Sequence, residues 1–322
     1  MKRYLPLLLS AAVVLFSLTG FASAQDYPAK PVRIIVPFPP GGVNDLAARI
    51  VATQLSERLG KQFVVENRGG AGGVAGTEMA ANAPKDGYTL LITSIASTVT
   101  PHLTKLPYEP VTSFTPVSML VSVPTVLVVH PELPAKSVKE LIALAKAKPG
   151  DLQYSSSGIG ASLHLAGELF KMMTGVDILH VPFRGAGPAM IDTMGGHTKV
   201  GFGSITSAIP HIRSGKLRAL GIGDKRRSPA LPDVPTIDEA GVAGYEAGNW
   251  IGLVAPAGTP APIVARLHKE IAAVLDTPDA QKQFANEGAE VWRMSPEEFG
   301  AFMRSELAKW GRVVKEAGIK AQ

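Results

Sequence analysis

Residues 37–50, PFPPGGVNDLAARI, place three prolines and two glycines between a short apolar run and a stretch with helical spacing. The preceding run, VRIIV, is typical of a buried strand. In the stretch that follows, Leu46, Ile50 and Leu55 recur near the helical period, and Gly60 is a typical helix end. A glycine turn between a strand and a helix can hold an enzyme's nucleophile, the phosphates of a nucleotide or a plain carboxylate. The neighbouring motifs must distinguish these three.

The alternation of apolar runs, glycine turns and helical stretches continues along the chain. The first part predicts a βαβαβ series and therefore a parallel sheet, and a second α/β series follows the proline-punctuated stretch 114–134. The last apolar strand, 250–256, and three helices beginning near Pro262, Pro278 and Pro296 have no sheet of their own. We therefore expect them to pack on the first sheet, which makes the first domain discontinuous.

These elements predict an α/β fold with two domains. Domain 1 is expected to comprise residues 25–124 and 226–322 and domain 2 residues 125–225, with chain crossings near 121–126 and 221–228. The mature chain is long enough for two domains of ordinary size. Because 46% of the whole sequence is hydrophobic, each domain can bury a core.

The first 24 residues are typical of a secretory signal peptide. Lys2 and Arg3 precede an apolar stretch that ends at Ala22-Ser23-Ala24, a small-x-small cleavage pattern. The apolar stretch is short for a membrane anchor, which is the alternative interpretation. The chain contains no cysteine, which excludes disulfides and thiolate metal sites and suits an oxidising compartment. We expect cleavage after Ala24 and a periplasmic protein.

The charge of the chain excludes one class of partner. The net charge of +5 falls to +3 when Lys2 and Arg3 leave with the leader, and it is spread thinly. A nucleic-acid partner is therefore not expected. A mild positive charge is instead suited to attracting small anions.

Residues 69–76, GGAGGVAG, match the alanine-ending dinucleotide fingerprint through Gly70, Gly72 and Ala75. The acidic residue that should end the next strand and hold a ribose hydroxyl is missing, because that strand runs into Ile95. The chain also lacks a phosphate loop ending in Gly-Lys-Ser/Thr. We expect no nucleotide and no other cofactor.

The motif nearest to hydrolase chemistry is GASLH, residues 160–164, yet no nucleophile elbow of the form G-x-S-x-G occurs. Ser162 and His164 lie two residues apart on one predicted helix, so they point in different directions. No H-E-x-x-H pair occurs among the seven histidines, and His164 with Glu168 offers only two metal ligands. We expect no metal site. A secreted α/β hydrolase acting on a small acid remains the alternative function.

Glycine-rich turns follow several predicted strands in both series, at residues 41–42, 69–73, 158–160 and 185–187. Ligands of open α/β sheets bind at this edge. A helix start there presents unpaired backbone N–H groups and the positive end of the helix dipole, which attract an anion. Each turn alone is also explained by tight-turn geometry. Several such turns on two domains favour an anion-binding cleft between them.

Four polar side chains beside these turns have two interpretations each. Asp45 can cap its own helix or accept a hydrogen bond from a ligand. Ser162 can cap a helix or offer its hydroxyl group and N–H to a ligand. The fork of Arg184 suits a carboxylate but is also compatible with a solvated loop. His164 is either a buried, hydrogen-bonded helix residue or a ligand contact.

Five ordered motifs, covering nearly all of the mature chain, resemble the substrate-binding proteins of tripartite tricarboxylate transporters, also called Bug receptors. They are residues 37–91, SSGIGASLHLAGELF, HVPFRGAGPA, LPDVPTIDEAG and W-x-G-L-x-A-P-A-G-T-P. The resemblance implies a two-lobed, Venus-flytrap fold of the periplasmic-binding-protein type. It also implies binding of a small organic carboxylate in the central cleft, delivery to a membrane permease, and no catalysis. Gly69 departs from the family, in which proline is common at this position.

Matched motif by motif, the resemblance implies ligand contacts from both lobes. The first lobe would contribute Phe38, Pro39, Gly41, Gly42, Asp45, Ser94 and Ser97. The second lobe would contribute Gly158, Ser162, His164, Arg184, Gly185, Ala186 and Ser204. Proteins resembling this one bind tricarboxylates, dicarboxylates, acidic amino acids, nicotinate or aromatic acids, and the sequence does not select one of them.

We therefore predict a monomeric periplasmic receptor that captures a small carboxylate. In this hypothesis the PPGG turn cradles one carboxylate with converging N–H donors, which makes its burial tolerable. The second lobe supplies its donors only on closure, so the ligand favours the closed state by its differential affinity. A sensor kinase is an alternative client to the permease.

Overall fold

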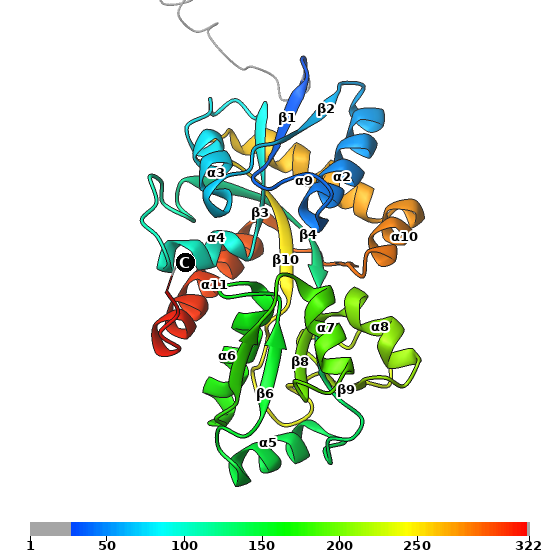
Figure 1. Cartoon of the computed structure of the whole chain (residues 1–322). Helices are drawn as coiled ribbons and strands as arrows, with labels where there is room; N and C mark the ends of the chain where they lie inside the picture. Colours follow the sequence, from blue (N-terminus) through cyan, green and yellow to red (C-terminus); the bar gives the residue numbers. More distant parts are fainter. Residues whose placement is uncertain (1–26, 321–322) are drawn as a thin grey trace, which may run out of the picture.

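The structure is a computed structural model, and it describes residues 27–320. The predicted leader and its cleavage site after Ala24 lie outside the described residues. The described chain forms two lobes, one above the other in Figure 1, and each lobe is built on one mixed β-sheet with helices on its faces. The predicted two-lobed α/β fold is confirmed.

The first lobe contains a six-stranded sheet whose three strands at one end, β3, β1 and β2, are parallel. Its strands, in spatial order, are β11 (Glu290–Val291), β4 (Phe114–Val123), β10 (Asn249–Pro256), β3 (Thr89–Ser94), β1 (Val32–Val36) and β2 (Phe63–Asn67). Strand β1 pairs in parallel with β2 and β3, whereas β10 runs antiparallel to both β3 and β4. The predicted βαβαβ series is therefore β1 to β3.

Helices cover both faces of this sheet. They are α2 (Val43–Leu59), α3 (Val74–Ala81), α4 (Ala96–Val99), α9 (Ala261–Leu275), α10 (Pro278–Asn286) and α11 (Pro296–Glu316), with short 3-10 helices η2 (Ala71–Gly73) and η3 (Thr100–His102). Successive strand residues point to opposite faces. Ile34 accordingly belongs to the core formed with α2, α9 and α10, and Ile35 to the core that includes α11. The prediction that the last helices pack on the first sheet is confirmed.

The second lobe contains a five-stranded sheet. Its strands, in spatial order, are β7 (Leu179–Pro182), β6 (Gln153–Ser156), β8 (Val200–Ser204), β5 (Thr125–Val129) and β9 (Arg218–Ile222). Its helices are α5 (Val138–Ala147), α6 (Ser162–Thr174), α7 (Ala186–Met194) and α8 (Ile205–Arg213). Val126 and Val128 pack with α7 and α8, while Leu127 and Val129 pack with α5 and α6. Strand β6 is parallel to β7 and β8.

The chain changes sheet twice. The first change is at Pro124, between β4 and β5, inside the predicted span 121–126. The second lies in the segment 223–248, between the end of β9 and the start of β10. In that segment the Ala247 N–H donates to the Gly223 carbonyl, at 2.9 Å, and Tyr245 Oη donates to a carbonyl of α6, at 2.8 Å. We therefore propose that domain 2 extends to about residue 247.

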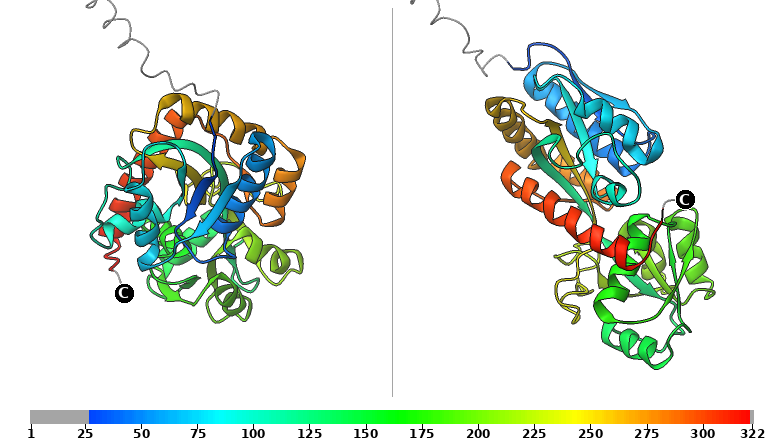
Figure 2. Two further views of the ribbon diagram at one scale, coloured as in Figure 1. Left: turned by 90° about the horizontal axis from the view of Figure 1, so that it is seen from above. Right: turned by 90° about the vertical axis from the view of Figure 1, so that its left-hand side faces the viewer.

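Helix α11 joins the two lobes. It packs against β4 in the first lobe and against α6 in the second, and Figure 2 shows it running from the one lobe to the side of the other. Its start is fixed by a capping box, in which Ser295 and Glu298 each accept the other's backbone N–H. Buried Glu306 accepts hydrogen bonds from the indoles of Trp250 and Trp310, which ties α11 to the start of β10.

The packing of α6 on β6 provides a test of the fold. A methyl group at Gly167 would overlap the buried ring of Tyr154. We expect Gly167→Ala to lower the free energy of unfolding by about 1–3 kcal/mol, measured by urea denaturation. Gly187→Ala is the control, because its methyl group would enter open space in another helix of the same lobe. Equal losses in the two variants would contradict this packing.

Candidate functional site

The carboxyl ends of the parallel strands place a row of helix starts at the waist of the molecule. In the first lobe α2 follows β1 and α4 follows β3, and β1 and β3 are parallel. In the second lobe α6, α7 and α8 follow the three parallel strands β6, β7 and β8. Figure 1 shows α2 and α4 at the lower end of the upper lobe and α6 and α7 at the upper end of the lower lobe. Ligands of such sheets bind at this edge.

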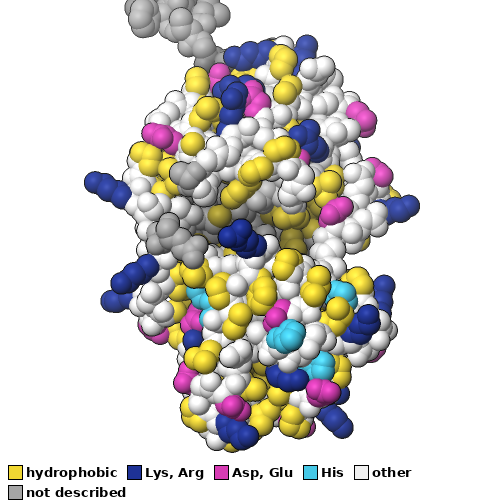
Figure 3. Space-filling view, viewed as in Figure 1, with side chains coloured by type: hydrophobic (Ala, Val, Ile, Leu, Met, Phe, Trp, Pro, Cys, Tyr) yellow, Lys and Arg dark blue, Asp and Glu magenta, His cyan; other side chains and the backbone are white. Residues whose placement is uncertain are grey.

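A pocket of about 390 Å³ lies between the lobes at this edge. In the space-filling view the surface is hollowed at the waist, where backbone, uncharged polar and hydrophobic atoms border the hollow and a Lys or Arg side chain stands at its rim (Figure 3). No side chain that lines the pocket carries a charge. The first lobe contributes Phe38, Asn44, Gly72, Ser94, Ile95, Ala96, Val99, Thr100, Leu103 and Asn249, and the second contributes Ile159, Gly160, Ala161, Ser162 and Leu165.

Free backbone donors begin the two helices beside this pocket, and Asn44 and Ser162 of those first turns line it. In α2 the first N–H bonded within the helix is that of Leu46, which donates to the Gly42 carbonyl, and in α6 it is that of Leu165. The N–H groups of residues 43–45 and 162–164 therefore have no hydrogen-bond partner within residues 27–320. Such first-turn groups, together with the helix dipole, attract an anion without a cationic side chain.

Three glycine N–H groups of the turns are already paired with side chains. Gly41 donates to Asp45 Oδ2, at 3.0 Å, Gly158 to Ser156 Oγ, at 3.2 Å, and Gly160 to His164 Nδ1, at 3.0 Å. These glycines therefore shape the turns, and the donors that remain for a ligand belong to the residues just after them.

Asp45 holds the PPGG loop in place. Its buried carboxylate accepts hydrogen bonds from Gly41 N–H and Arg49 Nε, both at 3.0 Å, and from Asn67 Nδ2, at 2.9 Å. Burial alone would raise the pKa of the Asp45 carboxyl, but the hydrogen bonds from Arg49, Gly41 and Asn67 lower it below the ordinary value. Asn67 also donates to the Phe38 carbonyl, at 3.2 Å, so one network fixes both sides of the loop.

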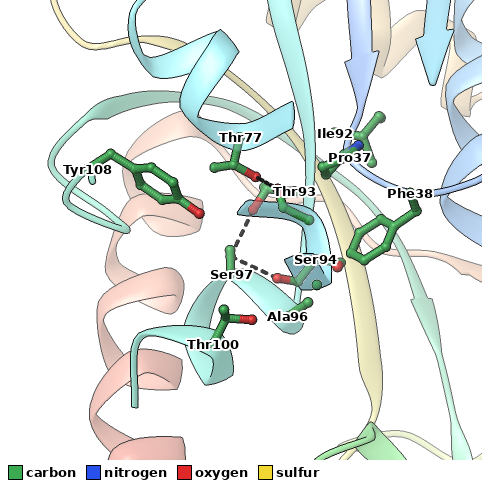
Figure 4. A pocket seen from close by; sticks show the side chains of 12 residues that line it. Pro37, Phe38, Thr77, Ile92, Thr93, Ser94, Ala96, Ser97, Thr100 and Tyr108 are labelled. Carbon is green, nitrogen blue, oxygen red and sulfur yellow. Dashed lines mark hydrogen bonds between the residues drawn. The ribbon is translucent and has the colours of Figure 1, made fainter. Parts of the chain in front are cut away.

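Behind Phe38 lies a narrow recess in the first lobe. Figure 4 shows Phe38 on one side of it and the hydroxyl of Tyr108 on the other, with a hydrogen bond of 2.9 Å from Thr93 Oγ1 to Ser97 Oγ between them. The recess holds about 20 Å³, which is the space for about one water molecule. The body of a ligand therefore has to lie on the pocket side of Phe38.

Beneath the glycine turn of the second lobe, two histidine rings are stacked. The centroids of His164 and His180 lie 3.9 Å apart and the rings are 14° from parallel. Burial, followed by the Lys171 charge, lowers the pKa of His164 to about 4. Burial, followed by the His164 charge, lowers the pKa of His180 to about 4. Both rings are therefore neutral near pH 7.

The residues predicted as ligand contacts fall into three groups. The first group lines the site: Phe38, Ser94 and Ser162 line the pocket, and Ser97 lines the recess. Asp45 and His164 stand behind the turns. The others lie outside the lining of both cavities, and the exposed side chain of Arg184 has no hydrogen bond or ion pair within the described residues. They are Pro39, Gly41, Gly42, Gly158, Arg184, Gly185, Ala186 and Ser204.

Sequence reasoning did not single out Asn44 and Asn249, which line the pocket. Their side-chain oxygens are buried and have no hydrogen-bond partner within the described chain. Asn44 directly precedes Asp45 in the opening motif, and Asn249 directly precedes the strand WIGLVAP, so both stand at strand or helix starts. The sequence signal that could have identified the two asparagines was their position next to these motifs.

Comparison with known proteins agrees with this geometry. Residues 47–319 match the tripartite tricarboxylate transporter family receptor, TctC. The chain belongs to this receptor family. It is 39% identical to protein BugT of Bordetella pertussis over 97% of this chain and 98% of that protein.

Two solved structures are similar over almost their whole length. One is an R. palustris protein solved with adipate, at 38% identity and a TM-score of 0.73, covering 92% of this chain and 99% of that one. The other is a TctC solute-binding protein from Polaromonas without ligand, at 29% identity and a TM-score of 0.83, covering 90% of this chain and 99% of that one. The described helices of our receptor include none long and apolar enough to span a membrane.

The network around Asp45 provides a mutational test. We expect Asp45→Asn to lower the free energy of unfolding by about 1–3 kcal/mol, because the amide keeps one acceptor oxygen and turns an N–H group toward other donors. Asp279→Asn is the matched control, since Asp279 also lies in the first turn of a helix but is exposed. Urea denaturation of both variants measures the effect. A loss in Asp45→Asn no larger than that in the control would contradict the role of Asp45.

The stacked histidines predict a pH dependence of stability. Because the folded pKa values of about 4 lie below the ordinary histidine value of 6.5, the unfolded chain binds protons first as the pH falls. The contribution of the neutral histidines to the free energy of unfolding is therefore complete above pH 6.5. It is lost between pH 6.5 and 4, by up to about 1.4 kcal/mol per pH unit for each histidine. Thermal unfolding between pH 7.5 and 5 should show a falling midpoint that flattens in His180→Gln. A flat wild-type profile would contradict it.

Proposed function

We propose that this protein is a periplasmic solute-binding receptor that captures one small organic carboxylate between its lobes and delivers it to the permease of a tripartite transporter. The observation that supports this most strongly is the uncharged inter-lobe pocket bordered by the free N–H groups of α2 and α6. A carboxylate can be buried there because several main-chain donors converge on it.

The first lobe is proposed to bind the carboxylate first, through the starts of α2 and α4, with Phe38 and Ser94 beside it. Closure then brings the start of α6, with Ser162, onto the ligand. The outlying residues Arg184, Gly185, Ala186 and Ser204 are proposed to reach the ligand only in the closed form. A ligand that gains these contacts on closure favours the closed state.

We propose that the structure represents the open form. The chain superimposes better on the Polaromonas protein without ligand, at a TM-score of 0.83, than on the adipate-bound protein, at 0.73. In sequence, however, the chain is less similar to the Polaromonas protein, at 29% identity, than to the adipate-bound protein, at 38%. A difference in lobe arrangement accounts for this reversal better than a difference in fold.

The alternative of a secreted hydrolase has one structural candidate, the hydrogen bond of 2.6 Å between Ser156 Oγ and His180 Nε2. Ser156 is fully buried, and its oxygen also accepts the Gly158 N–H. Neither residue lines the pocket. A nucleophile has to reach its substrate, so this pair serves the structure of the turn and favours the receptor over the enzyme.

The experiment is a thermal-shift screen of the mature chain with dicarboxylates, tricarboxylates, acidic amino acids and aromatic acids. An acid present at about 100 times its dissociation constant should add about 2.7 kcal/mol to the free energy of unfolding. The matching amides, which lack the carboxylate, are the control and should add nothing. NMR of the acid after incubation should show it unchanged. Stabilisation by no acid, or conversion of the acid to a product, would contradict the proposal.

A further inference from the structure

The turn 158–161 forms much of the pocket lining that comes from the second lobe. Ile159, Gly160 and Ala161 line the cavity, followed by Ser162 at the start of α6. Gly158 and Gly160 adopt φ values of +126° and +75°, a backbone region that other residues rarely adopt. Glycine adopts these values without strain but is conformationally free, so contacts from outside the turn help to hold it in one shape.

The stacked histidines give that support from beneath. His164 Nδ1 accepts the Gly160 N–H at 3.0 Å, so this nitrogen carries no proton. His180 Nε2 pairs with Ser156 Oγ at 2.6 Å, and the same oxygen accepts the Gly158 N–H at 3.2 Å. The two glycine N–H groups of the turn are therefore fixed by the two histidines, one directly and one through a serine.

His164 itself does not line the pocket and is 5% exposed. Its role in the site therefore passes through Gly160. We propose that His164 is a positioning residue, whose neutral ring holds the ligand-binding turn in shape through the Gly160 N–H and releases it on taking up a proton. This inference rests on the proposed function, because it concerns the affinity of the same pocket.

A proton on Nδ1 would turn the acceptor of the Gly160 N–H into a second donor. It would also place a positive charge against the ring of His180, 3.9 Å away. The titratable groups that act on the pair are Tyr154 of β6 and Glu168 and Lys171 of α6. Glu316 of α11 lines the groove beside Glu168 and Lys171.

Glu168 offers little compensation for a proton on His164. Its Oε1 lies 3.8 Å from His164 Nε2, and the same oxygen already accepts hydrogen bonds from Tyr154 Oη, at 2.7 Å, and Lys171 Nζ, at 3.1 Å. A carboxylate that is already paired with a cation attracts a second one less. The ring is therefore kept neutral by its surroundings across the ordinary range of histidine titration.

Two substitutions of His164 distinguish the effect of its hydrogen-bond acceptor from the effect of the size of its ring. In His164→Asn the side-chain oxygen can stand where Nδ1 stands and accept the Gly160 N–H, but it does not titrate. In His164→Leu a methyl group replaces the acceptor and leaves that N–H unpaired. We expect the dissociation constant of an acid found in the screen to change by less than about threefold in the first variant and to rise by about tenfold or more in the second.

His130→Leu is the matched control. His130 Nδ1 also accepts a backbone N–H, that of Glu132 at 3.3 Å, but this turn does not line the pocket. The control should leave affinity unchanged. At pH 4 the wild type should lose about twofold more affinity than His164→Asn, because half of the His164 rings carry a proton at their pKa of about 4. Comparing two proteins at one pH cancels the titration of the acid itself.

Hydrogen exchange of the Gly160 amide in the ligand-free protein tests the positioning role without any ligand. The amide should be protected in the wild type and in His164→Asn and unprotected in His164→Leu. Equal affinity and equal protection in all three proteins would overturn the inference while leaving the receptor function intact. A wild type that binds no acid would refute the receptor function, and the protection of Gly160 would still decide the role of His164.

Discussion

The first turn of every α-helix contains backbone N–H groups that the helix cannot pair, and this constraint organises the binding region. The parallel strands of both sheets end at the waist, so the helices that follow them begin there. Unpaired donors from α2 and α6 consequently border one uncharged pocket between the lobes. An anion satisfies these donors, whereas a neutral apolar molecule would leave them buried and unpaired.

Buried side chains are needed to keep such a site in shape. Asp45 accepts the Gly41 N–H and fixes the loop of the first lobe, and His164 accepts the Gly160 N–H beneath the turn of the second. Each is a polar group that faces away from the cavity and carries a perturbed pKa. A perturbed pKa therefore marks residues that support a binding turn as well as residues that contact a ligand.

The elements with strong local signals could be predicted from the sequence. The period of Leu46, Ile50 and Leu55 and the glycine at residue 60 located α2, and Gly60 adopts the left-handed conformation expected of a helix end. The long connection between β9 and β10 has no such local signal. The segment 223–248 has the composition of a linker, yet Ile237 and Tyr245 are buried in the core, and burial of single residues leaves no periodic pattern.

The glycine turns of the site were also predicted, but which of their N–H groups are already paired was not. The sequence indicated helix starts and glycines together, and in the structure the N–H groups of Gly41, Gly158 and Gly160 bond to side chains. The reason is physical: whether a backbone donor is free depends on the rotamers of side chains around it, and a motif does not encode them. Ser94 and Ser162 line the pocket as the resemblance implied, while Asn44 and Asn249 were found only in three dimensions.

The most direct test of the account is the distance between the lobes with and without an acid. Since the chain has no cysteine, spin labels can be placed on cysteines introduced at exposed Arg68, after β2, and exposed Ile191, in α7. Electron–electron double resonance should show one broad distance in the free protein and a shorter, narrower one when a binding acid is added. A distance unchanged by saturating acid would contradict capture between the lobes.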